Sequence, residues 1–421
     1  MKTALVTLAA LACVCGFSFA EVARYDNYRI YSFTVTIAAQ IKVIEDLDES
    51  SDSVIFLSKP SHMSNEGRVV VAPHKFADFE EILELHGISF TVLEKNIQRQ
   101  MDMEKATLKS RKRVEGYDFE NYHKLEEIND WLQSLEKKYT GVVSLINAGK
   151  SYEGRDILGV KISHGPNKPG VFIEAGIHAR EWISPATIIF IVNELLTSKD
   201  EGVQHIAKSY DWYVFPSVNP DGYVYTHQKN RLWRKTRSPH GSCIGVDANR
   251  NWDFHWNEIG ASDNPCSDTY SGPSAFSEPE TLAISNYITN LKDKIHLYLS
   301  FHSFSQLIIF PYGHTAEPVE NHKDLQEIGN EAAKALAKRY GTKYVVGDIY
   351  NTIYPASGTS IDWARGVLDI SLSYCYELRP KNQFQGGFEL PAKQIKPTSL
   401  ETLDSLVALI KRSEELGYFS N

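Results

Sequence analysis

The chain has 421 residues, 42% of them hydrophobic and 23% charged, which is typical of a folded globular protein with room for one large and one small domain. Its formal net charge is −9, and its basic residues are scattered apart from the run at residues 109–113. These values argue against disordered, fibrous and nucleic-acid-binding classes.

The first twenty residues have the pattern of a secretory signal peptide. Lys2 precedes an apolar stretch at residues 4–17, and the segment ends in the small-x-small sequence Ser18-Phe19-Ala20. A membrane-spanning helix needs about 20 apolar residues, and we find no such later stretch. We therefore expect a signal peptide at residues 1–20 and a secreted, extracellular product without a membrane anchor.

Residues 28–93 predict a small α+β domain. Alternating or apolar runs predict strands, and apolar residues at helical spacing predict two helices. In chain order the predicted elements are strand 28–36, helix 37–47, strands 53–57 and 68–72, helix 78–86 and strand 88–93. This βαββαβ order is that of a ferredoxin-like fold.

A polar connector with helical character is predicted at residues 98–109. It closes on Ser110-Arg111-Lys112-Arg113, a sequence that suits a trypsin-like protease. A solvated basic turn is the alternative interpretation. The position between two domain-sized patterns favours proteolytic processing.

From residue 114 to residue 421 helices and strands alternate, which predicts a mixed α/β domain. The predicted elements are helix 122–138, strands 142–148, 157–162 and 170–174, helix 185–196, strands 212–217 and 295–301, helix 322–340, strand 368–376 and a helix beyond Pro397.

The cysteines limit the disulfide pattern. Cys13 and Cys15 leave with the signal peptide, so the remaining three can form at most one internal disulfide. Cys243 and Cys266 flank a loop-like stretch rich in Asn, Asp, Ser and Gly, whereas Cys375 lies inside a strand pattern. We predict a Cys243–Cys266 disulfide and a free Cys375.

Metal-ligand side chains follow two predicted strands. His178 and Glu181 come after strand 170–174, and His302 directly follows strand 295–301. Ligands of open α/β sheets bind at the carboxyl ends of strands, so these groups can converge. Two His and one Glu leave a fourth position open for water, as a catalytic zinc site requires. The sequence predicts one zinc ion per chain, although a lone His-x-x-Glu spacing would be weak evidence.

A third predicted strand, 368–376, runs into Glu377. Because side chains alternate along a strand, Cys375 and Glu377 lie on the same face. On its own Glu377 would be interpreted as a surface residue of a half-solvated strand. Beside a metal-bound water, a carboxylate that is not a ligand is a candidate general base.

Guanidinium and amide groups are concentrated at residues 230–237 and 247–252. A solvated basic surface is the alternative. The planar guanidinium of arginine can form two hydrogen bonds with one carboxylate. A cation beside a metal can also stabilise the negative charge that develops on a reacting oxygen.

Together these segments resemble the pancreatic-type zinc carboxypeptidases, of the secreted digestive A subtype, over nearly the whole chain. The motifs that carry the resemblance are HAREW at 178–182, NRLWRKTRS at 230–238, DANRNW at 247–252, residues 302–306, IYPASGTSIDW at 353–363 and the YELR stretch ending at residue 379. The resemblance implies a mixed parallel and antiparallel eight-stranded sheet flanked by helices, at residues 114–421. An α+β ferredoxin-like activation propeptide would precede it at residues 21–113.

The resemblance also implies roles for single residues. His178, Glu181 and His302 would bind the zinc ion, and Asp247 would hold the far nitrogen of His178. Residues that would bind substrate are Asn249, Arg250 and Tyr354 at the terminal carboxylate and Arg180 at a neighbouring subsite. The catalytic pair would be Arg234, which polarises the scissile carbonyl, and Glu377, which takes a proton from the attacking water and passes it to the departing amine.

The side-chain pocket sets the specificity of this family. The matching positions here are small or apolar: Gly313, Ile349, Ala356, Ile361 and Cys375. Relatives that cut after Lys or Arg carry an acid at the position of Ile361, where an apolar side chain would leave a cation unpaired. We therefore expect a preference for aliphatic or aromatic C-termini, with fine preference open because Cys375 and Phe304 depart from the family pattern.

Three alternatives remain beside this interpretation. The first is an enzyme with B-type or broad specificity, and the second is an inactive relative that only binds C-termini, although its ligand and base residues are intact. A zinc amidohydrolase acting on non-peptide amides is the third, but it would not need the carboxylate-binding trio.

The resemblance further implies a monomer that meets peptides with free C-termini and a trypsin-like activating protease. The family tends to have a cis peptide at the Arg379-Pro380 step, and proline makes that isomer cheaper, so we predict a cis bond there.

Overall fold

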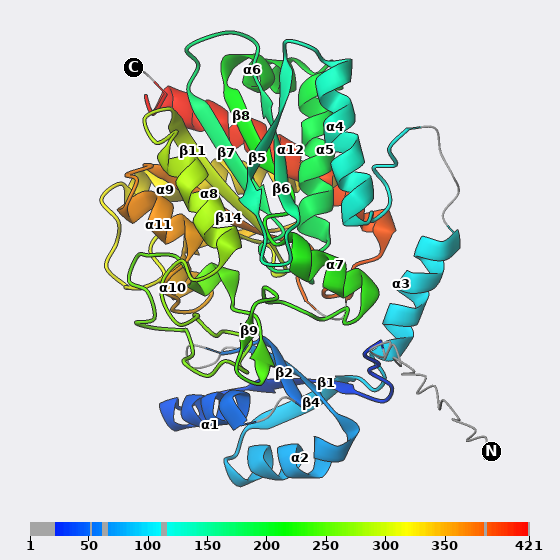
Figure 1. Cartoon of the computed structure of the whole chain (residues 1–421). Helices are drawn as coiled ribbons and strands as arrows, with labels where there is room; N and C mark the ends of the chain where they lie inside the picture. Colours follow the sequence, from blue (N-terminus) through cyan, green and yellow to red (C-terminus); the bar gives the residue numbers. More distant parts are fainter. Residues whose placement is uncertain (1–21, 51–52, 61–65, 111–115, 383–384, 420–421) are drawn as a thin grey trace, which may run out of the picture.

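The computed structural model describes residues 22–50, 53–60, 66–110, 116–382 and 385–419. The predicted signal peptide and the basic residues 111–113 lie outside the described residues. Figure 1 shows a small domain in the lower part of the view, a large domain above it, and helix α3 standing at the side between them. Within the described residues, no helix combines the length and apolar character needed to cross a bilayer.

The small domain has the predicted βαββαβ order. Its elements are β1 (Arg29–Thr34), α1 (Ala38–Ser50), β2 (Val54–Ser58), β3 (Glu66–Val71), α2 (Phe76–Leu85) and β4 (Ser89–Glu94). The four strands pair antiparallel in the order β2-β3-β1-β4. Both helices cover one face of this sheet, where Tyr31, Phe33, Phe56 and Phe79 build a separate apolar core.

Helix α3 (Gln98–Ser110) is the connector, and its bounds agree with the prediction. Only Gln98 and Met101 in its first turn are buried, because most of its other side chains are polar. Most of its other residues are exposed, and Figure 1 shows the helix standing at the side of the molecule.

The large domain contains the predicted mixed eight-stranded sheet, in the order β13-β12-β14-β11-β7-β8-β6-β5. Its strands are β5 (Val143–Lys150), β6 (Asp156–Ile162), β7 (Gly170–Ala175), β8 (Asp211–Phe215), β11 (Ile295–Ser303), β12 (Leu307–Phe310), β13 (Val345–Asp348) and β14 (Leu372–Leu378). The central strands β14, β11, β7 and β8 run parallel, so their carboxyl ends meet at one edge.

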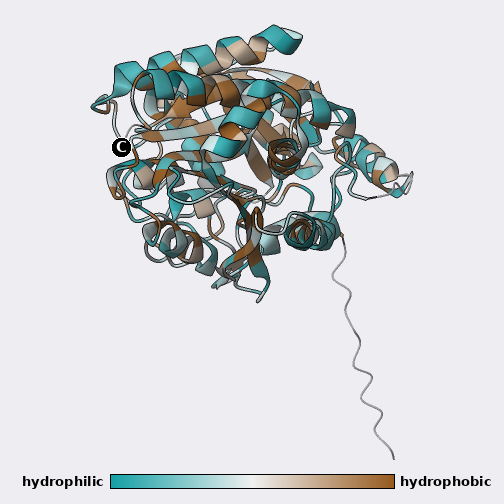
Figure 2. Ribbon diagram, turned by 90° about the horizontal axis from the view of Figure 1, so that it is seen from above, coloured by the Kyte–Doolittle hydropathy of each residue, from teal (hydrophilic) through white to brown (hydrophobic). Residues whose placement is uncertain are grey.

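Helices cover both faces of this sheet. One face packs against α4 (Leu125–Lys138), α5 (Ile183–Thr197), α6 (Glu201–Ser209), α7 (Pro220–Gln228), α9 (His322–Tyr340) and α12 (Ile395–Glu415). The other face packs against α8 (Pro279–Thr289), α10 (Ile349–Thr352) and α11 (Ser360–Gly366). Figure 2 shows the brown apolar residues gathered on the strands and inner helix faces, with teal faces outward.

Strand β14 alternates as predicted. Its residues Tyr374 and Tyr376 pack into the core on the α12 side, whereas Cys375 packs on the α11 side. The predicted start of this strand at residue 368 is wrong, because Asp369 has φ 56° and a left-handed residue cannot continue a strand. The strand begins at Leu372.

Other boundaries and short elements also differ from the sequence-based prediction. Helix α4 begins at Leu125 rather than at residue 122, and α12 begins at Ile395, so that Pro397 lies in its first turn, where proline is tolerated. Strands β12 and β13 span only four residues each and were not predicted individually. The short strands β9 (Pro239–His240) and β10 (Cys243–Ile244) form a separate hairpin.

The predictions about the cysteines and about one peptide bond are confirmed. Cys243 and Cys266 form a disulfide and Cys375 is a buried free thiol. The Arg379-Pro380 peptide bond is cis.

Candidate metal centre and active site

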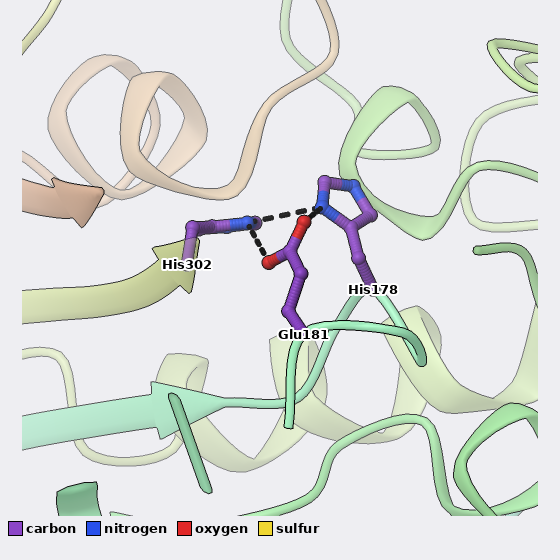
Figure 3. Close-up of side chains that lie close together, drawn as sticks. All are labelled: His178, Glu181 and His302. Carbon is purple, nitrogen blue, oxygen red and sulfur yellow. Dashed lines mark hydrogen bonds and ion pairs between the residues drawn. The ribbon is translucent and has the colours of Figure 1, made fainter. Parts of the chain in front are cut away.

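Two strand ends deliver the predicted ligand side chains to one place. After β7, the chain turns at Gly176, which has φ 68° and whose added Cβ would lie 3.1 Å from the backbone oxygen of Pro216. This turn aims His178 and Glu181 towards the end of β11, where His302 lies (Figure 3). Glycine is needed here because a side chain would be strained in this close approach.

The three side chains form a compact donor set. Glu181 Oε1 lies 2.8 Å from His178 Nδ1, and Glu181 Oε2 lies 3.1 Å from His302 Nδ1. The two Nδ1 atoms are 3.0 Å apart, and all three residues are buried (Figure 3). Two Zn–N bonds of about 2.0–2.1 Å at a tetrahedral angle would separate the nitrogens by roughly 3.3 Å, so the set fits zinc.

Asp247 links this donor set to Arg234. Its Oδ1 lies 3.1 Å from His178 Nε2, and its Oδ2 accepts hydrogen bonds from Arg234 Nε at 3.1 Å and Nη2 at 2.7 Å. Burial alone would raise the pKa of Asp247, but Arg234 and His178 outweigh it and hold that pKa well below its ordinary value. An ionised Asp247 can therefore orient the imidazole of His178.

Glu377 lies directly beside His302, because the two residues are partners in the parallel β11–β14 register. No described residue donates a hydrogen bond to its carboxylate. Burial raises the pKa of Glu377 to about 7, with the cationic form of His302 opposing and Glu181 reinforcing the shift. A carboxyl group with such a pKa can both take up and release a proton near neutral pH.

Four of the predicted substrate-binding and catalytic residues line one cavity of about 240 Å³: Arg180, Arg234, Arg250 and Tyr354. The guanidinium of Arg250 donates to the backbone oxygens of Gly260 at 2.8 Å and Asn249 at 2.9 Å. The small domain closes the cavity with residues that include Ile44, Asp48 and Phe56. In this chain the small domain therefore covers the arginine-lined side of the site.

Asn249 lies between Arg250, which donates to its backbone oxygen, and His302 of the donor set. Its Nδ2 lies 3.4 Å from His302 Nε2, and its Oδ1 accepts a hydrogen bond from Ser360 N at 2.9 Å. Its own backbone N–H donates to Asp247 Oδ1 at 2.9 Å. The side-chain amide of Asn249 thus has a partner at each end, and its backbone is held by Asp247.

The five predicted pocket residues also lie together. An added Cβ on Gly313 would lie 2.5 Å from the Ala356 backbone oxygen and 3.0 Å from Ile349 Cγ2. Ile349, Ile361 and Cys375 pack in one buried apolar cluster on the α11 side of the sheet. This is the side that carries Glu377.

Sequence reasoning missed partners that come from distant loops. Arg180 Nη1 donates to Asp268 at 3.1 Å and to the Leu232 backbone oxygen at 3.3 Å, and its guanidinium carbon lies 4.5 Å from the centre of the Phe388 ring. Neither Asp268 nor Phe388 stands in a periodic pattern or next to a strand end. We find no local signal that could have identified them.

Comparisons with known proteins agree with this geometry. Residues 128–405 match the zinc carboxypeptidase family, and residues 31–104 match the carboxypeptidase activation peptide. The relative named zinc carboxypeptidase A 1 from Anopheles gambiae is 50% identical over 413 residues, covering 98% of this chain and 95% of the relative. The protein of the same name from Drosophila melanogaster is 51% identical over 409 residues, covering 95% of each chain.

A solved structure extends the likeness to three dimensions. Carboxypeptidase A from Helicoverpa armigera superposes with a TM-score of 0.85 at 30% sequence identity. The match covers 93% of this chain and 99% of that one, so both domains are included.

Proposed function

Because the chain belongs to the zinc carboxypeptidase family and carries that family's activation peptide, we propose that it is a secreted proenzyme that removes single residues from the C-termini of peptides, preferring apolar ones. The observation that carries this proposal is the place of Glu377, whose carboxylate accepts no hydrogen bond from a described residue, beside His302 of the donor set. Asp247 joins that set to Arg234, which lines the arginine-rich cavity.

His178, Glu181 and His302 are the residues that would hold zinc. When bound, zinc supplies a Lewis acid that polarises a carbonyl and lowers the pKa of a bound water to about 7. Asp247 fixes the orientation of the His178 ring through a hydrogen bond between its Oδ1 and the Nε2 of His178. Arg234, held by the same carboxylate, presents a guanidinium that can stabilise negative charge developing on the scissile carbonyl oxygen.

Glu377 is proposed to move the proton. Its carboxylate takes a proton from the attacking water, and the resulting carboxylic acid returns it to the departing amine. Its raised pKa supports both steps, because neither protonation state is strongly disfavoured near neutral pH.

The terminal carboxylate of the substrate is proposed to bind Arg250, Asn249 and Tyr354. Arg250 is buried and its guanidinium carbon lies 5.7 Å from the Tyr354 ring centre. A carboxylate that binds between these two side chains would therefore meet a guanidinium that is already in position. An internal peptide bond offers no such anion. This arrangement supports removal of C-terminal residues rather than internal cleavage.

The side-chain preference rests on Ile361. It is buried in the same apolar cluster as Cys375 and Ile349, and the five proposed pocket residues carry no acid. A Lys or Arg side chain would lose its hydration there without gaining a counter-ion. Selectivity for basic C-termini is therefore the less favoured alternative.

Latency is proposed to come from the small domain, which covers the cavity until the chain is cut near residue 113. We place the signal peptide at 1–20, the propeptide at 21–113 and the catalytic domain at 114–421, and we expect the mature enzyme to be a monomer. Secretion through the signal peptide and activation by a trypsin-like protease belong to this proposal.

The test is hydrolysis of matched peptides that end in Phe, Leu, Lys or Glu. We expect release of Phe and Leu only after trypsin treatment, and loss of that activity with a zinc chelator. Full activity of the metal-stripped, processed protein would contradict the proposed chemistry.

Ile361→Asp tests the pocket assignment. The new carboxylate would pair with a cationic side chain, so the ratio of kcat/KM for Lys over Phe should rise by at least about tenfold. Leu282→Asp, at an exposed position on α8, is the matched control and should leave the ratio unchanged. An unchanged ratio in Ile361→Asp would show that the pocket lies elsewhere.

A further inference from the structure

One buried acidic residue has no part in the proposed chemistry. Glu174 lies in β7, four residues before His178, and its side chain is fully buried. Its Oε1 accepts hydrogen bonds from Ser300 Oγ at 2.7 Å, Ser360 Oγ at 2.9 Å and Tyr298 Oη at 3.2 Å. Its Oε2 has no hydrogen-bond partner among the described residues.

The strand register places Glu174 beneath the active site. Glu174 pairs with Ser300 on β11, and Ser300 pairs with Cys375 on β14. Two residues further along these strands, His302 pairs with Glu377. Because strands rise about 3.3 Å per residue, the Glu174 row lies roughly 7 Å below the row of His302 and Glu377 on the same face.

Ser360 connects Glu174 to the substrate-binding residues. It is the first residue of α11, and its backbone N–H donates to Asn249 Oδ1 at 2.9 Å. The next residue in the helix is Ile361. The Ser360 hydroxyl and amide thus join the carboxyl of Glu174 to the side chain of Asn249.

We propose that Glu174 is a positioning residue that sets the carboxylate-binding and specificity residues through Ser360. The inference rests on the proposed function, because it takes Asn249 and Ile361 as contacts of the terminal residue. Glu174 holds the start of α11 against the sheet. That contact fixes Asn249 at the terminal carboxylate and Ile361 at the terminal side chain.

A stability role alone does not account for this residue. Burying a carboxyl group with one unpartnered oxygen is unfavourable, and an apolar side chain would avoid that cost. Two of its three donors lie on β11, inside the sheet, where neighbouring strands are already joined by backbone hydrogen bonds. The Ser360 donor is the one that reaches α11.

Ser360→Ala and Tyr298→Phe form a matched pair for the test, because each removes one hydroxyl donor to the same oxygen. In the processed, zinc-loaded enzyme we expect Ser360→Ala to raise KM for a peptide ending in Phe by about five- to tenfold, with kcat within about twofold. Tyr298→Phe should keep the wild-type KM and kcat. The inhibition constant of free L-phenylalanine should rise in parallel with KM in Ser360→Ala alone.

Glu174→Gln is the conservative variant at the proposed positioning residue itself. A glutamine keeps an acceptor oxygen for the three hydroxyls, so its KM should stay near the wild-type value. Thermal unfolding of each variant measures stability separately from the kinetic constants.

The outcomes separate this inference from the proposed function. A wild-type enzyme that hydrolyses the peptide, combined with an unchanged KM in Ser360→Ala or an equal increase in Tyr298→Phe, would overturn the inference and leave the function standing. A zinc-loaded, processed wild type that releases no terminal residue would overturn the proposed function and this inference with it.

Discussion

The contacts that join the small domain to the large domain differ in kind from those that build the active site. Between the domains, Tyr25, Ile97 and Met101 of the small domain and connector pack in one apolar cluster with Phe304 and Phe388 of the large domain. The large domain contributes a buried polar network in which His178, Asp247 and Arg234 bond to one another. Apolar contacts form and separate without leaving unpaired charges, whereas the polar network is costly to break.

This difference implies that latency and turnover are separable properties of the chain. The hydrogen bonds among His178, Glu181, Asp247, Asn249 and Arg234 all lie within the large domain. Release of the small domain therefore leaves them in place. Variants in the polar network should change catalysis or metal affinity, and variants in the small domain and connector should change only activation.

The largest effect is expected for Glu377→Gln. The amide cannot accept the proton, so kcat should fall by roughly a thousandfold while zinc content and KM stay near the wild-type values. Steady-state kinetics and metal analysis of the processed enzyme measure this. Glu280→Gln is the control, since Glu280 is another buried acid whose Oε1 accepts from the Tyr152 N–H at 3.0 Å. A Glu377→Gln enzyme with normal turnover would remove Glu377 from the reaction.

Asp247→Asn should have the second largest effect. Loss of its charge weakens its hold on His178 and Arg234 together, so zinc affinity or activity should fall by roughly ten- to a hundredfold. Competition with a chromogenic chelator measures the affinity. Asp268→Asn is the matched control, because Asp268 pairs with Arg180 and touches no proposed ligand. Equal zinc affinities in both variants would refute the proposed support of His178.

The smallest effect is expected for Glu104→Gln in the connector helix. Glu104 forms a two-pronged ion pair with Arg231, whose side chain is only 8% exposed, at 2.6 and 3.1 Å. Weakening this pair should lower the affinity of the cleaved propeptide by about tenfold, and full activity should appear sooner after trypsin cleavage. Inhibition of the mature enzyme by added propeptide measures the affinity.

Asp102→Asn on the same helix is the control for that experiment. Asp102 is half exposed and its ion pair is with Arg24 of the small domain. It should activate at the wild-type rate. Equal activation of Glu104→Gln and wild type, or equal inhibition of the mature enzyme by the two propeptides, would contradict the proposed role of Glu104 in latency.

Much of the fold could be predicted from local patterns. The helices of the small domain and the long helix α9 follow from apolar residues at helical spacing, and the strands of the small domain follow from alternating or apolar runs. Short elements do not give such a signal. Helix α7 begins at Pro220 with an Asn219 cap, and it is buried on most sides, so its apolar residues show no clear period.

The candidate site divides in the same way. His178, Glu181, His302 and Glu377 each follow or end an apolar strand pattern, and parallel strands bring their carboxyl ends to one edge. The alternation within β14 put Cys375 and Glu377 on one face, and the structure agrees. These positions follow from the two-residue alternation of side chains along a strand and from the shared edge at which parallel strands end. Both can be inferred from a single sequence.

The sequence by itself therefore determined the element types, the candidate donor set and the Cys243–Cys266 disulfide, because each depends on short-range periodicity, composition or residue type. The tertiary structure alone decided that Asp247 is shared by His178 and Arg234, that Ser360 reaches Glu174 across 186 residues, and that Glu104 pairs with Arg231 across 127 residues. Such contacts form when the packed sheet and loops bring distant segments together. The spacing of residues within a short segment does not predict which distant segments will meet.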